Sequence, residues 1–475
     1  MPTTAEPQGV SQRLAAWVVT APRTWTAQGA AMARLAVQDS LICAISGAGD
    51  LKPILDALDP VPVGCPVPGR RDLRVLPDAA ALAWGTAFHK RELDDQTYSM
   101  GGHLMCVTLA ALIGTRYGRA VAWEGLYDAI TIACEVASRL NLCLTRKHME
   151  AGWVATTTYG LIAATCALAR IEKFSVAETL AALSMAGAKA FGAKNIFGTP
   201  AKAVNPGLAA RDAVMLARLA RAGLAASVDP LEGPFGFGQM YRGSAAPDWS
   251  QLVPEAEGGV PLIATGMAFK KYACCASAHR CIDALLALRA EHGFTAQDVD
   301  SVIARVGPLN ALTLRYPDPK TPSEALFSMP YSLASALRFG SIGPADFSAR
   351  ALADPDTRAL LPRIRMALVP EALVEGFVET VPLAHCVEVT LKHSSTRFCK
   401  SVLYPKGAPQ NPFTADDWRE KFHHCTDGIL SSDHARTLAT SLNALETVSL
   451  TDIVNLVSQF DSPYDPMGTR FRRAP

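Results

Sequence analysis

Residues that can move protons or bind anions are concentrated in one short stretch of this sequence. Between Arg91 and His103 the chain reads RELDDQTYSMGGH, so Glu92, Asp94 and Asp95 precede a Gly-Gly-His and a long apolar run. A carboxylate beside an imidazole can carry general acid–base catalysis, because histidine has an unperturbed pKa near 6.5. The plain alternative is a solvated loop in which Asp94 and Asp95 cap a helix or form salt bridges. On this stretch alone both interpretations stay open.

Three lysines and a tyrosine in other segments could act together with these acids. Lys202 lies in NIFGTPAKAVNPG, a region with few other charges, and Lys270 and Lys271 precede a segment that reads as a buried helix. Tyr331 follows a proline in ALFSMPYSLA. Cationic side chains neutralise carboxylates and stabilise enolate-like charge, which is often the largest single contribution to catalysis. The alternative for Lys202 is an ordinary surface lysine.

Metal and nucleotide sites are not predicted. Cys274, Cys275 and His279 are possible ligands, but adjacent cysteines suit a single ion poorly. His-His-Cys at 423–425 is another possible set of ligands, but neither CxxC nor HExxH occurs in the chain. The glycines of 233–238 lack a strand-loop-helix context, and no GxxxxGK[ST] or GxSxG sequence is present. We therefore interpret the cysteines as buried thiols.

Composition narrows the class of protein. The 475 residues are 49% hydrophobic and only 19% charged, which predicts two domains, a large buried surface and an oligomer. A net charge of +1 offers no footprint for nucleic acid or an anionic membrane. Scattered cysteines and the lack of a secretory signal in the first residues favour a cytoplasmic location. The uncharged run 151–169 is long enough to span a membrane, but its Thr, Gly and Ala content favours a buried helix.

The pattern of apolar residues predicts a helical body with an inserted smaller lobe. From about residue 26 to 225 the sequence is alanine-rich and helical, without a persuasive strand, and near residue 261 the pattern changes to α+β. Spacings typical of helix N-caps occur at 175–178 and 414–417, and helices resume after the second. Helices are predicted at 34–46, 123–140, 176–188, 208–222 and, after a short lead-in, 270–288; strands are predicted at 299–307, 386–393 and 397–404, the last two as a hairpin.

In this order the segments resemble the MmgE/PrpD family, which includes 2-methylcitrate dehydratase, cis-aconitate decarboxylase and iminodisuccinate epimerase. The resemblance covers nearly the whole chain and rests on LAVQDSLICAISG, ELDDQT, PAKAVNPGLAARDA, DPLEGPFGF, KKYACCASAHRCIDALLAL, FSMPYSLA and PKGAPQNPFTADDWREKF. It implies a mainly α fold, with an all-helical domain from residues 1–264 and 405–475 and an α+β lid from 265–404. It also implies a homodimer, and a site between the domains that uses no metal or organic cofactor.

The resemblance also implies a set of site residues. The implied catalytic residues are Glu92, His103, Lys202, Lys270 and Tyr331; the implied substrate-binding residues are Thr97, Lys271, Cys275 and His279. His103 would transfer a proton, Glu92 would orient it or bind a hydroxyl, and Tyr331 would donate to a leaving group. Lys271 is the off-by-one alternative to Lys270. Val154 departs from the family, because a histidine is common at this position, and Cys275 replaces a histidine of the mammalian decarboxylase.

These residues predict a lyase that removes a proton next to a carboxylate of a di- or tricarboxylate. Dehydration, as in 2-methylcitrate dehydratase, is the first expectation. Epimerisation of the iminodisuccinate type and decarboxylation of a cis-aconitate-like acid are the alternatives, since all three begin with similar charge development. The missing histidine at Val154 favours a non-standard outcome. A hypothesis of another class is a polycarboxylate-binding protein without catalytic activity.

Overall fold

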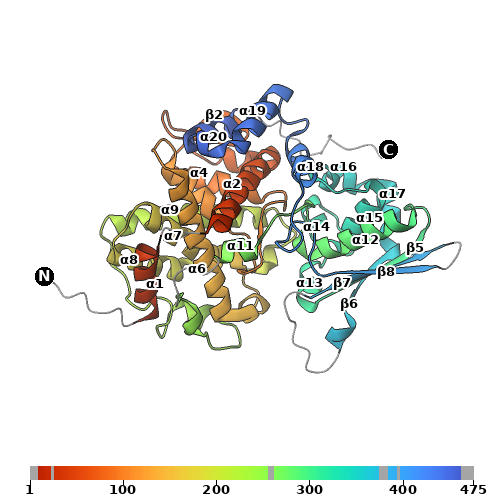
Figure 1. Cartoon of the computed structure of the whole chain (residues 1–475), viewed down its shortest axis with the longest axis horizontal. Coiled ribbons are helices and arrows are strands. Elements are labelled where there is room, and N and C mark those ends of the chain that lie inside the picture. The colour runs from red at the N-terminus through yellow and green to blue at the C-terminus, as the bar shows by residue number, and fades with distance from the viewer. Residues whose placement is uncertain (1–8, 23–25, 255–260, 374–382, 393–395, 462–475) are drawn as a thin grey trace.

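A computed structural model describes residues 9–22, 26–254, 261–373, 383–392 and 396–461 of the chain. Figure 1 shows two lobes, one built only of helices and small hairpins, the other of helices around a sheet. The C-terminal helices α19 (Ser432–Asn443) and α20 (Leu450–Ser458) lie on the first lobe, so both halves of the chain build it. The predicted mainly α fold with a smaller α+β part is confirmed.

The helical lobe packs long apolar helices against one another. The longer ones are α1 (Val10–Thr20), α2 (Ala27–Gly47), α4 (Pro77–His89), α5 (Met105–Arg116), α6 (Trp123–Glu150), α7 (Ala155–Ile171), α8 (Val176–Lys189) and α9 (Ala201–Arg221). Short helices α3 (Lys52–Leu55), α10 (Phe237–Tyr241) and α11 (Leu262–Gly266) join them. The uncharged run discussed above forms α7, which is buried in this lobe, and none of the described helices is long and apolar enough to cross a membrane.

The second lobe contains a four-stranded sheet in the order β6-β5-β7-β8. Its strands are β5 (Val299–Val306), β6 (Ile364–Leu368), β7 (His385–Leu391) and β8 (Arg397–Val402), and β7 and β8 pair antiparallel, as predicted. The helices are α12 (His279–His292), α13 (Pro308–Thr313), α14 (Pro322–Ala325), α15 (Met329–Phe339), α16 (Ala349–Leu352) and α17 (Pro355–Leu360). α18 (Ala415–Thr426) follows the sheet and packs on α2, which returns the chain to the helical lobe.

Local signals located several helices: those predicted at 34–46, 123–140 and 176–188 lie within α2, α6 and α8. Both predicted caps are present: Ser175 accepts from the backbone of Glu178, and Thr414 accepts from that of Asp417. α9, however, begins at Ala201, earlier than predicted, and runs through Pro206. This earlier start places the predicted site lysine in the first turn of the helix.

Two predictions about elements are wrong. The region 26–225 does contain strands: β1 (Cys65–Val67) and β2 (Arg70–Val75) form an antiparallel hairpin, with alternating burial in β2 at Leu73 and Val75. The helix expected at 270–288 begins only at His279. Strand β4 (Met267–Ala268) lies just before this segment and pairs with β3 (Gln96–Thr97) of the helical lobe. After β4, the backbone N–H of Phe269 donates to the oxygen of Gly407, and that of Cys275 donates to the oxygen of Leu326. These long-range bonds override the local helix preference there.

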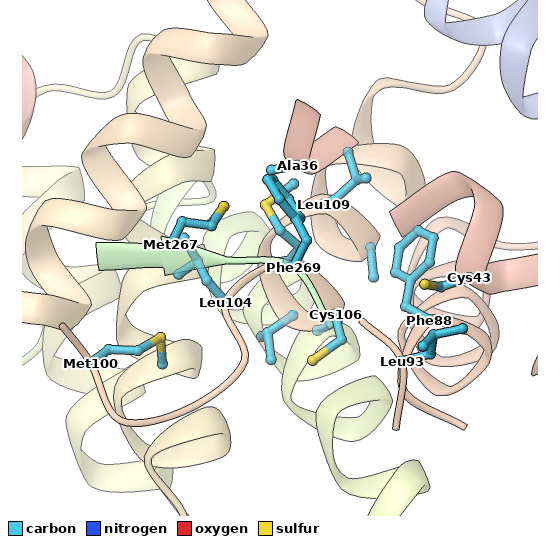
Figure 2. Close-up of a cluster of buried hydrophobic side chains, with 14 of the residues drawn as sticks. Ala36, Cys43, Phe88, Leu93, Met100, Leu104, Cys106, Leu109, Met267 and Phe269 are labelled. Atoms are coloured by element: carbon cyan, nitrogen blue, oxygen red, sulfur yellow. The ribbon is translucent and has the colours of Figure 1, made fainter. Parts of the chain in front are cut away.

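The hydrophobic core continues beneath the acidic stretch. Figure 2 shows Met267 and Phe269, from β4 and the residues after it, close to side chains of α2 and α5 such as Ala36 and Leu109. Leu93, between Glu92 and Asp94, and Leu104, directly after His103, are also fully buried in this cluster. Apolar burial on both sides of the loop therefore fixes the backbone that carries Glu92 and its neighbours.

Candidate active site

A cavity of about 400 Å³ lies between the two lobes. Its walls combine residues of the helical lobe, among them Glu92, His103 and Lys202, with residues of the lid such as Cys275 and Arg280. Clefts between domains that combine apolar walls with a few convergent polar groups are the usual place for small-molecule sites. This cavity is therefore the candidate active site.

One buried carboxylate lies between two ammonium groups at the base of the cavity. Glu92 accepts from Lys202 through Oε1 and from Lys270 through Oε2 at 3.0 Å, and Lys270 also donates to the backbone oxygen of Glu92 at 2.9 Å. His89 adds a further link, because Lys202 contacts its Nε2 while its Nδ1 lies 2.8 Å from Asp94. All five side chains are buried, so these charges interact with little solvent screening.

Close helix packing brings Lys202 to this cluster. His89 is the last residue of α4 and Lys202 lies in the first turn of α9, and these two helices contact one another extensively. Their backbones approach at Gly207, where an added Cβ would lie 2.3 Å from the carbonyl oxygen of Leu82. A larger residue there would push the helices apart, so the glycine is required for the contact between the lysine and the acid.

Strand pairing brings Lys270 to the same carboxylate. β3 follows the acidic loop and β4 precedes the lysine pair, and they pair with Thr97 opposite Met267. The two lysines follow β4 closely, and only one of them faces the acid. Lys270 does so, whereas Lys271 points to the other side and pairs with Asp417 at 2.7 Å.

Glu92 has an unusual backbone conformation. Its φ is +51°, in the left-handed region that is uncommon for residues other than glycine. Such a conformation persists only where the surroundings enforce it, and it is frequent at functional sites. The bonds from both lysines to this residue supply that constraint.

His103 has one ring nitrogen bound and one facing the cavity. Its Nδ1 lies 2.6 Å from the backbone oxygen of Asp95, which makes this nitrogen the donor and leaves Nε2 for a bound ligand. The Asp95 carboxylate accepts from the backbone of Leu104 and Met105 at the start of α5, so the acid caps the helix that follows the histidine. The capping role considered for Asp95 is therefore present.

Burial dominates the proton affinities in this region. Burial, together with Lys202 and Lys270, lowers the pKa of His89. Burial also lowers the pKa of His103, although the nearby Asp94 carboxylate opposes this effect. Burial and then Asp94 raise the pKa of Asp95 to about 7. Burial and the Lys270 ammonium lower the pKa of Lys202.

Three cations that the sequence analysis missed also line the cavity: Arg146, Lys194 and Arg280. Lys194 donates to the backbone oxygen of Met149, and burial followed by Arg146 lowers its pKa to about 8. Arg280 is buried and donates to the backbone oxygen of Leu403. Neither Lys194 nor Arg280 pairs with a carboxylate among the described residues, so both can meet an anionic ligand. Nothing in their local sequence marks them, because their direction depends on the packing of the lobes.

The structure separates the predicted site residues into two groups. Glu92, His103, Lys202 and Cys275 line the cavity, with Lys270 directly behind Glu92. Thr97 lies behind the wall, where its hydroxyl donates to the Asp95 carboxylate.

Three other predicted residues, Lys271, His279 and Tyr331, do not reach the cavity. The Tyr331 hydroxyl donates to the backbone oxygen of Asp346, and His279 contacts the backbone oxygen of Cys274 inside the lid. Both side chains serve the lid core, because α12 and α15 turn them toward it, so their assignment as substrate-contacting residues is corrected. Val154 does line the cavity, and its side chain is apolar.

Ligand-type side chains do gather near the site, but a cation already lies among them. One ligand atom each from His89, Glu92 and His103 could surround an ion. Two of those atoms, Nε2 of His89 and Oε1 of Glu92, contact the ammonium of Lys202. A divalent ion at this position would face a like charge, so the residues do not fit a metal site.

The chain is similar to known proteins along most of its length. The family model of the MmgE/PrpD N-terminal domain matches residues 12–250, and that of the MmgE/PrpD C-terminal domain matches residues 272–447. Cis-aconitate decarboxylase from Homo sapiens is 24% identical over 409 residues, which cover 83% of this chain and 82% of the human protein. Cis-aconitate decarboxylase from Mus musculus is 24% identical over 391 residues, covering 80% and 78% of the two chains.

Proposed function

Because this chain belongs to the MmgE/PrpD family, we propose that it is a lyase that removes a proton next to a carboxylate of a di- or tricarboxylate. The observation that carries the proposal is the cavity between the lobes, where several cations line the same wall as His103. Mono-anions would leave much of this positive charge unmatched. A substrate with two or three carboxylates matches it best.

The arrangement addresses the difficulty of this reaction. A proton beside a carboxylate is weakly acidic, because its removal adds negative charge to an existing anion. Fixed cations in a cavity with little water stabilise that added charge without reorganisation, which is the main catalytic contribution proposed for Lys202 and Arg280. His103 presents Nε2 to the substrate for proton transfer, since Asp95 fixes the other nitrogen as a donor.

Dehydration of a hydroxylated polycarboxylate is the first reaction that we propose. The second is decarboxylation of a cis-aconitate-like acid, which is favoured by the activity in the names of the human and mouse relatives. Both reactions place negative charge at the carbon next to a carboxylate, so the same residues serve either. No metal or organic cofactor enters the proposal.

Incubation with candidate acids in D2O, followed by proton NMR, tests the proposal. The panel is 2-methylcitrate, citrate, cis-aconitate and iminodisuccinate. New alkene signals indicate dehydration, loss of one carboxylate indicates decarboxylation, and deuterium at an unchanged skeleton indicates epimerisation. We expect His103→Gln to lower the active rate by about 10²–10⁴-fold, the usual contribution of a general acid or base.

The matched control is His423→Gln, because His423 is 62% exposed and lies outside the cavity. It should retain the wild-type rate. Binding of these acids without turnover or deuterium incorporation would instead identify a non-catalytic polycarboxylate-binding protein. An unchanged rate in His103→Gln would remove His103 from the mechanism.

A further inference from the structure

A second imidazole lines the cavity from the lid side. His385 is the first residue of β7 and is only 1% exposed. Neither of its ring nitrogens has a hydrogen-bond partner among the described residues. Buried polar side chains are nearly always hydrogen-bonded, and an unpaired buried donor or acceptor costs about 1–3 kcal/mol. An unpaired imidazole on a cavity wall therefore indicates that its partner is the ligand.

We propose that His385 is a catalytic residue of this site and acts with His103 as a pair of proton-transfer groups. This inference rests on the proposed function and assigns roles within it. His103 belongs to the helical lobe and His385 to the lid, so a substrate between the lobes contacts one imidazole from each side.

Few side chains on the cavity wall can transfer a proton at neutral pH. Val154, for example, precedes α7 and lines the cavity with an apolar side chain. Among the described residues, His103 and His385 are the histidines on the cavity wall. His89 lies behind them, with both nitrogens engaged by Asp94 and Lys202. Without His385, this cavity would hold one imidazole for a reaction that needs both an acid and a base.

Nearby charges differ between the two imidazoles and assign their roles. Burial lowers the pKa of His103, but Asp94 Oδ2 lies 3.5 Å from its Nδ1 and opposes this effect, and the carboxylates of a bound substrate favour the protonated ring further. No described carboxylate pairs with His385, and burial followed by the Arg280 guanidinium lowers its pKa to about 3. His385 is thus neutral in the empty cavity, and the carboxylates of a bound substrate raise its affinity for a proton. The neutral ring is the base and the ring beside Asp94 is the acid.

In the dehydration step, His385 takes up one proton and His103 gives up one. A lone pair of His385 takes the proton from the carbon next to the carboxylate, and the electrons of that C–H bond form the C=C bond. The C–O bond of the neighbouring carbon breaks, and its hydroxyl leaves as water with the proton of the His103 imidazolium. His385 ends protonated and His103 neutral, and exchange with solvent restores the starting forms.

Substitution of His385 with a rescue measurement tests the assignment. We expect His385→Gln to lower kcat by about 10²–10⁴-fold while KM changes less than kcat. In His385→Gly, free imidazole added to the assay should restore part of the rate, because the vacated space admits the missing base. A residue with only a structural role would show no such rescue. His423→Gln again serves as the control. His103→Gln should also lose turnover, and added imidazole should not restore it.

The outcomes separate this inference from the proposed function. If the wild type turns over an acid of the panel and His385→Gln stays within threefold of its kcat, the inference is overturned and the proposed function stands. If the wild type turns over none of the four acids, the proposed function fails. In that case, ¹⁵N NMR of the histidine-labelled wild type with citrate tests whether His385 contacts the ligand. The same measurement tests this contact if the variants do not fold. A shift of the His385 ring nitrogens supports the contact, and unchanged signals overturn it.

Discussion

At the scale of single residues, Glu92 is the most constrained side chain of the site. Its left-handed backbone, its burial and its two lysine partners all occur together. Two ammonium groups share this one carboxylate, so both bonds depend on its charge. The acid that looked like part of a solvated loop is therefore the group that holds both lysines in place.

Replacing this acid tests that role. Glu92→Gln removes the negative charge and leaves Lys202 and Lys270 buried beside one another without an anion. Breaking a buried ion pair in this way costs about 3–5 kcal/mol, and we expect a loss of this size in the free energy of unfolding. Urea unfolding followed by circular dichroism measures it.

The comparison variant is Glu150→Gln, which breaks a pair with Lys147 in which both side chains are 46% exposed. Exposed pairs of this kind contribute less than about 1 kcal/mol. Equal losses for the two variants would contradict the structural role given to Glu92.

At the scale of elements, two short features place the reactive groups. The β3–β4 pairing joins the acidic loop to the lysine pair, and the cap on α5 fixes the residues after His103. Asp95 contributes to both, because its carboxylate caps the helix while its backbone oxygen binds the imidazole. The orientation of His103 consequently depends on the start of α5.

The Asp95 cap gives a prediction with an internal control. Asp95→Ala removes the acceptor for two backbone N–H groups and the Thr97 hydroxyl, which should cost about 1–2 kcal/mol of stability. A shifted His103 should also lower kcat, by about 10²-fold for a displacement near 1 Å.

Asp95→Asn should be close to the wild type. Since burial and Asp94 raise the pKa of Asp95 to about 7, this acid is partly protonated near neutral pH, and an amide resembles the protonated form. Thermal unfolding and steady-state kinetics of both variants check the difference. A strong defect in Asp95→Asn would show that the charge, not the cap, is required.

At the scale of the whole molecule, the site exists only where the lobes meet. The helical lobe supplies His103, Glu92 and Lys194, and the lid supplies Cys275, Arg280 and His385. A ligand that contacts both groups joins the lobes, so binding stabilises their mutual arrangement. The homodimer expected from the family resemblance stays a prediction.

Ligand binding should therefore raise the thermal stability of the protein. Citrate at about 100 times its Kd would stabilise the folded state by about 2.7 kcal/mol, which corresponds to a rise of several degrees in Tm. Acetate at the same ionic strength should have little effect, because one carboxylate cannot reach cations on both lobes. Arg280→Gln should reduce the citrate shift, while Lys147→Gln, an exposed lysine outside the cavity, should preserve it. Equal shifts for citrate and acetate would contradict binding across the lobes.

Much of the fold could be predicted from local patterns. The cap at Ser175, the hairpin of β7 and β8 and most helices depend on residues close in the sequence, and the structure contains them. The hairpin of β1 and β2 escaped prediction because its strands are short and only part of β2 is buried. The late start of α12 escaped it because the backbone before this helix is bonded to distant segments, Phe269 to Gly407 and Cys275 to Leu326.

The sequence by itself determined the kinds of element, the family, and the acid, histidine and lysines that gather at the base of the cavity. Only the tertiary structure decided which side chains reach the cavity. It turned Lys270 rather than Lys271 toward Glu92, kept Tyr331 and His279 in the lid core, and brought Arg280 and His385 to the wall. The physical reason is that residue types and local periodicity are properties of neighbouring residues, whereas the direction of a side chain at a domain interface depends on strand pairing and packing between distant segments.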